Sequence, residues 1–150
     1  MRSVILWLSF MVPSGPILGA DQYGLEQRLS GLAGASAARC GNFRRPPASM
    51  PGPIALSRDE HQAVSQCITA AYRRKQGFFF LVEAPGADTF LAGGLVGTPS
   101  RTIKRFAFIS SCRPRRSDEP GSGPVCNQEF TTNPCSPPKT GLLSADLACK

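Results

Sequence analysis

The sequence predicts an α+β fold, in which one capped helix packs across a three- to four-stranded antiparallel sheet and disulfides staple the C-terminal tail. A helix signal over residues 57–77 is followed by three strand signals over 78–111, which gives the order αβββ. The connections between these strands are short, whereas a parallel crossover needs about a dozen residues or more. The three strands are therefore expected to form an antiparallel meander.

The helix has clear signals at both ends. Ser57 and Glu60 have the Ser-x-x-Glu spacing of a capping box, which satisfies free amides at a helix start. Gly77 is expected to end the helix, because glycine readily adopts the left-handed conformation found there. One apolar stripe has helical spacing and places Cys67 inward; it comprises Val64, Cys67, Ile68, Ala71 and Tyr72.

Residues 78–84, 89–96 and 102–111 have the aromatic and aliphatic composition of strands, and Gly93-Gly94 is expected to weaken or bulge the second one. A fourth, edge strand is possible over 127–132. Besides the helix stripe, the core is expected to contain two sets of strand residues, Phe78, Phe80 and Val82 in the first strand and Phe106 and Phe108 in the third.

Three regions divide the chain. Residues 1–20 have the layout of a secretory signal peptide, with Arg2 before the nine-residue apolar stretch Val4–Val12 and a small residue, Ala20, at the expected cut. That stretch is too short for a membrane-spanning helix, so the mature chain is expected to have no transmembrane segment and to be secreted or periplasmic. Residues 21–56, rich in Gly, Ala and Pro, suit a flexible arm in which 22–32 could form a short helix, and 57–150 form the small domain.

All six cysteines follow the leader. An even number in an exported chain favours disulfides, although six cysteines allow 15 connectivities. Proximity along the chain suggests three pairs, Cys40 with Cys67, Cys112 with Cys126, and Cys135 with Cys149. No Cys-x-x-Cys spacing is present, so neither a metal site nor a cofactor is expected.

The chain is basic, with a formal charge of +7. Its clustered cations would attract a polyanion, although solvated charge that serves solubility explains the same composition. Nucleic acid is possible but not favoured as a partner, because strand alternation would bury most of the aromatic residues near the cations. The candidate binding residues are Arg73, Arg74, Lys75, Phe79, Arg101, Lys104 and Arg105. Phe79, Leu81 and Ile109 could also form an apolar patch on the second sheet face.

No local motif for catalysis is present. His61, the one histidine, is expected to face solvent from the helix. We expect an exported, non-enzymatic binding domain that recognises a protein or an anionic envelope polymer. One alternative is a secreted hydrolase of RNA or another phosphodiester that uses Glu83, His61 and Arg105 as carboxylate base, histidine acid and phosphate clamp. A structural envelope protein is the other alternative.

Overall fold

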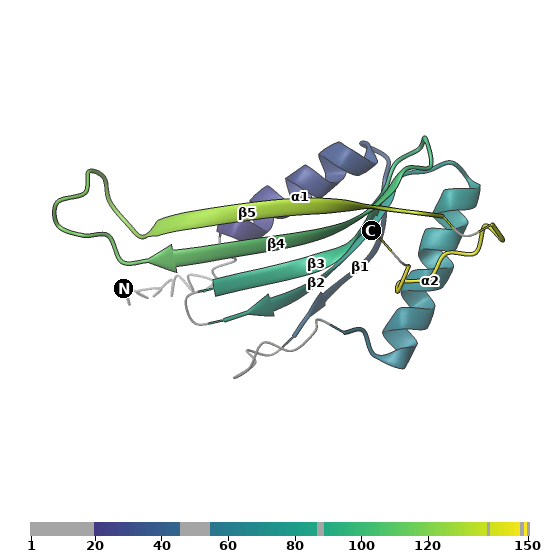
Figure 1. Ribbon diagram of the computed structural model, residues 1–150, viewed down its shortest axis with the longest axis horizontal. Coiled ribbons are helices and arrows are strands. Elements are labelled where there is room, and N and C mark those ends of the chain that lie inside the picture. Colours follow the sequence, from purple (N-terminus) through teal and green to yellow (C-terminus); the bar gives the residue numbers. More distant parts are fainter. Residues whose placement is uncertain (1–19, 46–54, 87–88, 138, 148, 150) are drawn as a thin grey trace, which may run out of the picture.

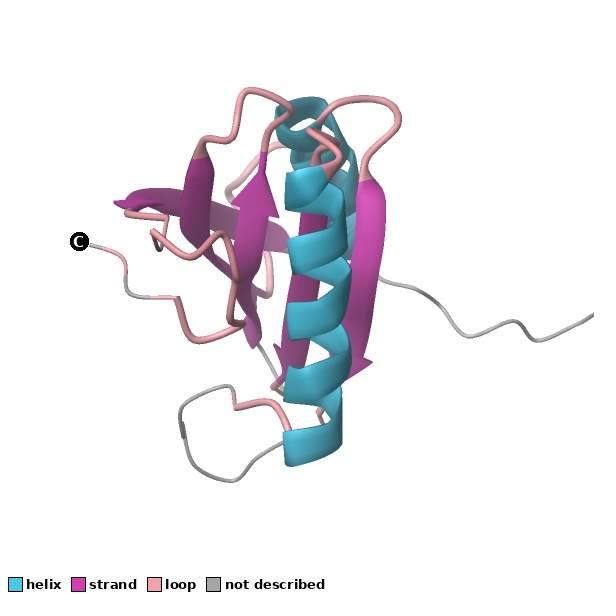
Figure 2. Cartoon of the chain, turned by 90° about the vertical axis from the view of Figure 1, so that its right-hand side faces the viewer, coloured by secondary structure: helices cyan, strands magenta, loops and turns pink. Residues whose placement is uncertain are grey.

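A mixed five-stranded sheet lies between two helices (Figures 1 and 2). The computed structural model describes residues 20–45, 55–86, 89–137, 139–147 and 149. The strands are adjacent in chain order; β1 and β2 are parallel, and every other neighbouring pair is antiparallel. The elements are α1 (Ala20–Ala33), β1 (Ala38–Arg44), α2 (Arg58–Arg73), β2 (Phe78–Pro85), β3 (Thr89–Gly97), β4 (Ile103–Arg113) and β5 (Val125–Cys135).

The predicted α+β class is confirmed, together with the capped helix, the three-stranded meander and the edge strand near 127–132. The antiparallel-only sheet of three or four strands was wrong, because β1 adds a fifth strand parallel to β2. Helix α2 connects β1 to β2, and a connection that includes a helix is long enough for a parallel crossover. The segment 21–56, expected to be a flexible arm, instead supplies β1 and all of α1 except Ala20. The short helix that was possible over 22–32 is confirmed by α1.

The composition of β1 does not indicate a strand. Its seven residues, ARCGNFR, contain no continuous apolar run. The register with β2 also shifts between Arg39 and Gly41, and Gly41 has a φ of 157°. This strand is defined by its pairing with β2, and local sequence preference contributes little.

The sheet buries apolar side chains on both faces. On one face, α2 covers Phe78, Phe80 and Val82, as predicted from its apolar stripe. On the other face, α1 packs its Leu25 and Leu29 against the opposite side of the sheet. The buried sheet residues under α1 are Phe79, Leu81, Ala92, Val96, Phe106 and Phe108.

The two predicted core sets therefore belong to different cores, with Phe106 and Phe108 under α1 instead of α2. The predicted apolar patch is also divided, since α1 buries Phe79 and Leu81, whereas Ile109 lies on the opposite face and is 43% exposed. The pairing of β2 with β3 is continuous from residue 78 to 85, so no bulge occurs at Gly93-Gly94.

Helix α2 begins with the predicted capping box, in which Ser57 and Glu60 bond reciprocally. It ends earlier than expected, at Arg73, and Lys75 rather than Gly77 has the left-handed backbone, with a φ of 53°. Gly77 has a different role, because a Cβ at this position would lie 1.6 Å from the carbonyl oxygen of Ala33. A glycine is needed here to let β2 pass close to the end of α1.

All three expected disulfides form: Cys40–Cys67, Cys112–Cys126 and Cys135–Cys149. The first joins β1 to α2, the second joins β4 to β5, and the third anchors the tail. The tail runs from β5 along α2 as an irregular segment, here called the C-terminal strap (residues 141–147), which buries Leu143 and Leu147 on the α2 side. The expected disulfide-stapled tail is thus confirmed.

Neither helix is long and apolar enough, within the part of the chain that the structure describes, to cross a membrane. The predicted leader, apart from Ala20, lies outside the described residues.

Candidate functional site

Three turns come together at one end of the molecule, at the upper right of Figure 1. They join α1 to β1, α2 to β2, and β3 to β4. Gly77, at the α2–β2 turn, lies close to Ala33 at the end of α1. Gly34, in the α1–β1 turn, lies beside Pro99 of the β3–β4 turn, because a Cβ added to Gly34 would be 3.8 Å from the Pro99 ring. Five of the predicted cations lie in or beside these turns, and we call this group the basic end: Arg73, Arg74, Lys75, Arg101 and Lys104.

The basic end has no acidic residue along its own segments. Residues 30–38, 71–77 and 97–105, which form the three turns and their flanks, contain neither Asp nor Glu. Among the described residues, the side chains that form ion pairs with carboxylates are Arg39, Arg45, His61 and Arg113. No member of the basic end is among them, so its positive charge is not neutralised locally.

The opposite end of the sheet is different. There, Arg113 bonds both carboxylate oxygens of Glu119, and Arg45 bonds both oxygens of Glu60 near the start of α2. These hydrogen bonds raise the pKa of both guanidinium groups and lower the pKa of both carboxyls, that of Glu60 to about 2. Two cations of this end, Arg45 and Arg113, therefore have carboxylate partners within the chain.

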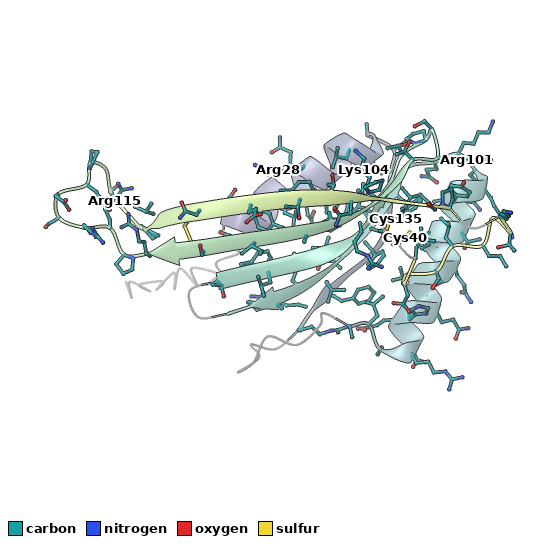
Figure 3. The ribbon with its side chains drawn as sticks, viewed as in Figure 1. Arg28, Cys40, Arg101, Lys104, Arg115 and Cys135 are labelled. Atoms are coloured by element: carbon teal, nitrogen blue, oxygen red, sulfur yellow. A yellow bond between two sulfur atoms is a disulfide. The ribbon has the colours of Figure 1, made fainter. Side chains whose placement is uncertain are left out.

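An arginine–aromatic contact fixes the geometry of the basic end. The Arg101 guanidinium carbon lies 5.1 Å from the centre of the Tyr72 ring, which places the β3–β4 turn against the end of α2. Such cation–π contacts stabilise exposed pairs by about 0.5–1 kcal/mol. Both Arg101 (φ 67°) and Lys75 have left-handed backbones, and Figure 3 shows Arg101 and Lys104 at the same end of the molecule.

Sequence reasoning missed two contributors to this end. Tyr72 was assigned to the core stripe, but it is only half-buried and supports Arg101. Leu142 of the strap is the other contributor, because it lines the same shallow depression as Arg73.

Two predicted binding residues lie elsewhere. Phe79 is 2% exposed beneath α1, with Arg39 5.9 Å from its ring centre, so it cannot act as an exposed stacking platform. Arg105 lies on the α2 face, where its Nη2 donates to the carbonyl oxygen of Leu147 at 2.7 Å. The alternation of β4 sends Lys104 and Arg105 to opposite faces of the sheet.

The three residues of the hydrolase alternative do not converge. Glu83 is completely buried, and it pairs with Ala92, which belongs to the core under α1. His61 and Arg105 lie on the other face, beside the strap. The sheet therefore separates the carboxylate from the histidine and the arginine.

His61 was expected to face solvent from the helix, but its side chain contacts the strap. Its Nε2 lies 2.8 Å from Oδ2 of Asp146 and 3.2 Å from Oγ of Ser144, both in the strap. The side chain is 34% exposed. No signal in the sequence places residues 144–146 against this helix, because the contact depends on the path of the disulfide-anchored tail.

Among the described residues, no cluster of three or more His, Cys, Asp or Glu side chains could hold a metal ion. No known family model, curated protein or solved structure matches this chain.

Proposed function

We propose that this chain is an exported, non-enzymatic binding domain whose basic end recognises an anionic polymer of the cell envelope or its surroundings. The observation that supports this most strongly is the grouping of five cations at one end, in segments that contain no Asp or Glu, whereas Arg45 and Arg113 at the other end pair with carboxylates. Like charges held close together repel one another, and a polyanion would relieve that repulsion.

The arrangement suits a polymer of repeated negative charge. The cations come from the end of α2, from the β3–β4 turn and from the start of β4, so they spread over a surface instead of lining one pocket. Exposed cations of this kind bind through electrostatic attraction and counterion release, which salt weakens steeply. Nucleic acid is the less favoured polymer, because Phe79 is buried and the Tyr72 ring is occupied by Arg101.

Export is part of the proposal. It is supported by the apolar leader in the sequence and by the pairing of all six cysteines, since disulfides persist in oxidising compartments. Mass spectrometry of the native protein, with and without reductant, should give a mature chain that starts at Asp21 with no free thiol. An intact Met1 together with free thiols would contradict export.

Binding can be tested with a matched pair of triple variants. In the first, Arg73→Gln, Arg74→Gln and Lys75→Gln remove three charges from the basic end. In the control, Arg44→Gln, Arg58→Gln and Arg116→Gln remove three exposed charges that lie elsewhere. Affinity for heparin, single-stranded RNA and anionic vesicles is measured at several salt concentrations.

We expect salt-sensitive binding to heparin by the wild type. For the basic-end variant, the slope of log Kd against log salt should fall by about one unit for each removed cation that contacts the polymer. The control should keep a slope close to that of the wild type. Equal losses in both variants would show attraction to net charge only, and no salt-sensitive binding to any probe would leave a protein as the partner.

A further inference from the structure

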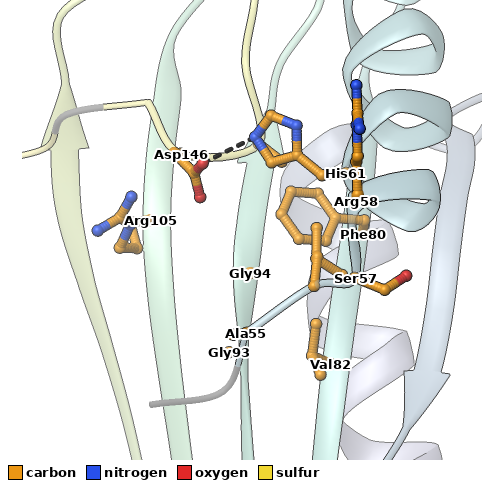
Figure 4. A pocket seen from close by; sticks show the side chains of 12 residues that line it. Ala55, Ser57, Arg58, His61, Phe80, Val82, Gly93, Gly94, Arg105 and Asp146 are labelled. Atoms are coloured by element: carbon orange, nitrogen blue, oxygen red, sulfur yellow. Dashed lines mark ion pairs between the residues drawn. The ribbon is translucent and has the colours of Figure 1, made fainter.

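A second candidate site lies on the α2 face, away from the basic end. A cavity of about 540 Å³ opens between the start of α2, the sheet and the strap (Figure 4). This volume lies within the range of small-molecule sites. Strand residues Phe80, Val82 and Gly93 line it on the sheet side, and its polar lining comprises Ser57, Arg58, His61, Arg105 and Asp146.

The floor of the cavity consists of Gly93 and of the small exposed parts of Phe80 and Val82, which are otherwise buried. A Cβ on Gly93 would meet only the carbonyl oxygen of Phe106, at 3.4 Å, so no close approach of the backbone requires a glycine. Its neighbour Gly94 differs, because a Cβ there would lie 2.0 Å from the carbonyl oxygen of Phe80. A mid-strand glycine weakens a strand. Here the missing side chain leaves space on the α2 face of the sheet, beside the cavity.

The wall of the cavity carries an oriented cation. The Arg105 guanidinium is fixed by the hydrogen bond from Nη2 to Leu147, and it forms no ion pair with a carboxylate of the described residues. A guanidinium has five N–H donors, so this bond leaves others for a ligand. The nearby carboxylate of Asp146 is paired with His61.

We propose that this cavity binds a small amphipathic carboxylate. Its apolar part would lie on Phe80 and Val82 above Gly93, and its carboxylate would accept hydrogen bonds from Arg105. Small-molecule sites combine apolar surface with a few oriented polar groups, and arginine suits carboxylates through its planar donors. The site shares no residue with the basic end, so either proposal can fail without the other.

The probe is octanoate, compared with 1-octanol and octylammonium, which have the same chain and a neutral or positive head. Binding to the mature, disulfide-bonded protein is measured by titration calorimetry below micelle-forming concentrations. We expect one saturable site for octanoate. The other two probes should bind at least about tenfold more weakly, because neither can form the charged hydrogen bond to Arg105.

Three variants locate the site. Arg105→Gln should weaken octanoate by about tenfold and leave 1-octanol unchanged, because it removes only the charged contact. Gly93→Leu should abolish the binding of octanoate and of 1-octanol, because the leucine side chain fills the space above the floor of the cavity. Arg116→Gln, an equal charge change in the distant β4–β5 loop, should bind octanoate like the wild type.

A measurement on the wild-type protein tests the site even if the variants do not fold. Intermolecular nuclear Overhauser effects should connect the octanoate methyl group to the ring of Phe80. Contacts to another part of the chain, absence of saturable binding, or wild-type affinity in folded Gly93→Leu would each overturn the proposal.

Discussion

His61 Nε2 and Asp146 Oδ2 lie 2.8 Å apart, so a helix side chain and the C-terminal strap are joined by an ion pair when the imidazole is protonated. Two further helix residues continue this contact at one-turn intervals. Ser65 Oγ accepts from the Ala145 amide, and Thr69 Oγ1 both donates to and accepts from the backbone of Leu143. A polar stripe on α2 thus aligns the strap, which also supplies the wall of the cavity at Asp146.

Thr69→Val is expected to destabilise the protein by about 1–3 kcal/mol. Thr69 is 9% exposed, and its hydroxyl is the partner of both the amide and the carbonyl of Leu143. Valine has nearly the same shape but leaves those buried backbone groups unsatisfied, which costs their desolvation. Urea unfolding of this variant is compared with that of Thr131→Val at an exposed position of β5. Equal midpoints for the two variants would contradict the role of Thr69.

Two disulfides offer a matched comparison, because each closes a sequence separation of 14 residues. Loss of either should lower the free energy of unfolding by about 3 kcal/mol through the entropy of the unfolded chain. Only Cys135→Ala with Cys149→Ala should also release the strap from α2. Limited proteolysis should therefore cut residues 141–147 faster in this variant than in Cys112→Ala with Cys126→Ala. Similar cleavage in both would show that the polar stripe alone holds the strap.

The pKa of Glu60 predicts a loss of stability in acid. Hydrogen bonds from Arg45, followed by the one from the Ser57 amide, lower this pKa from 4.5 to about 2. A carboxyl with a lowered folded-state pKa stabilises the protein above its unfolded pKa, and the contribution disappears as the pH falls from about 4.5 towards 2. Glu60→Gln should thus lower the melting temperature at pH 7 and show a smaller decline across that window.

The control for this pH dependence is Asp59→Asn, which removes the same charge one residue earlier. Asp59 is exposed and has no hydrogen bond to Arg45 or Ser57 among those found for the described residues. Its variant should retain the decline of the wild type between pH 4.5 and 2. If both variants decline alike, the Arg45–Glu60 pair does not control this transition.

Local signals predicted the elements that local physics determines. The capping box, the stripe of α2 and the strands β2 to β4 each have a periodicity that their own residues establish. Disulfide pairing by proximity was also correct, because each pair joins neighbouring elements. These signals set the fold class but leave open what covers the second sheet face.

Features that depend on long-range contacts could not be predicted. β1 pairs with β2 although its sequence has a weak strand preference. The spaced leucines indicated the helix α1, but not that it covers the second sheet face. The candidate site was predicted in part. Clustering along the chain identified Arg73, Arg74 and Lys75, but only the tertiary fold shows that Arg101 joins them and that Arg105 faces another site.

A pair of glycine variants tests the backbone geometry on which the fold and the cavity depend. In Gly77→Ala the new methyl group would overlap the carbonyl oxygen of Ala33 and lie 3.2 Å from that of Gly97, so α1 or β2 must shift. Such overpacking costs about 1–3 kcal/mol or more. In Gly93→Ala the methyl group has room, and reduced entropy of the unfolded chain should leave stability unchanged or raise it by up to about 1 kcal/mol. Thermal and urea unfolding should therefore show that Gly77→Ala lowers the stability and that Gly93→Ala leaves it unchanged or raises it. Equal losses of stability in both variants would show that the strand itself requires a glycine at position 93.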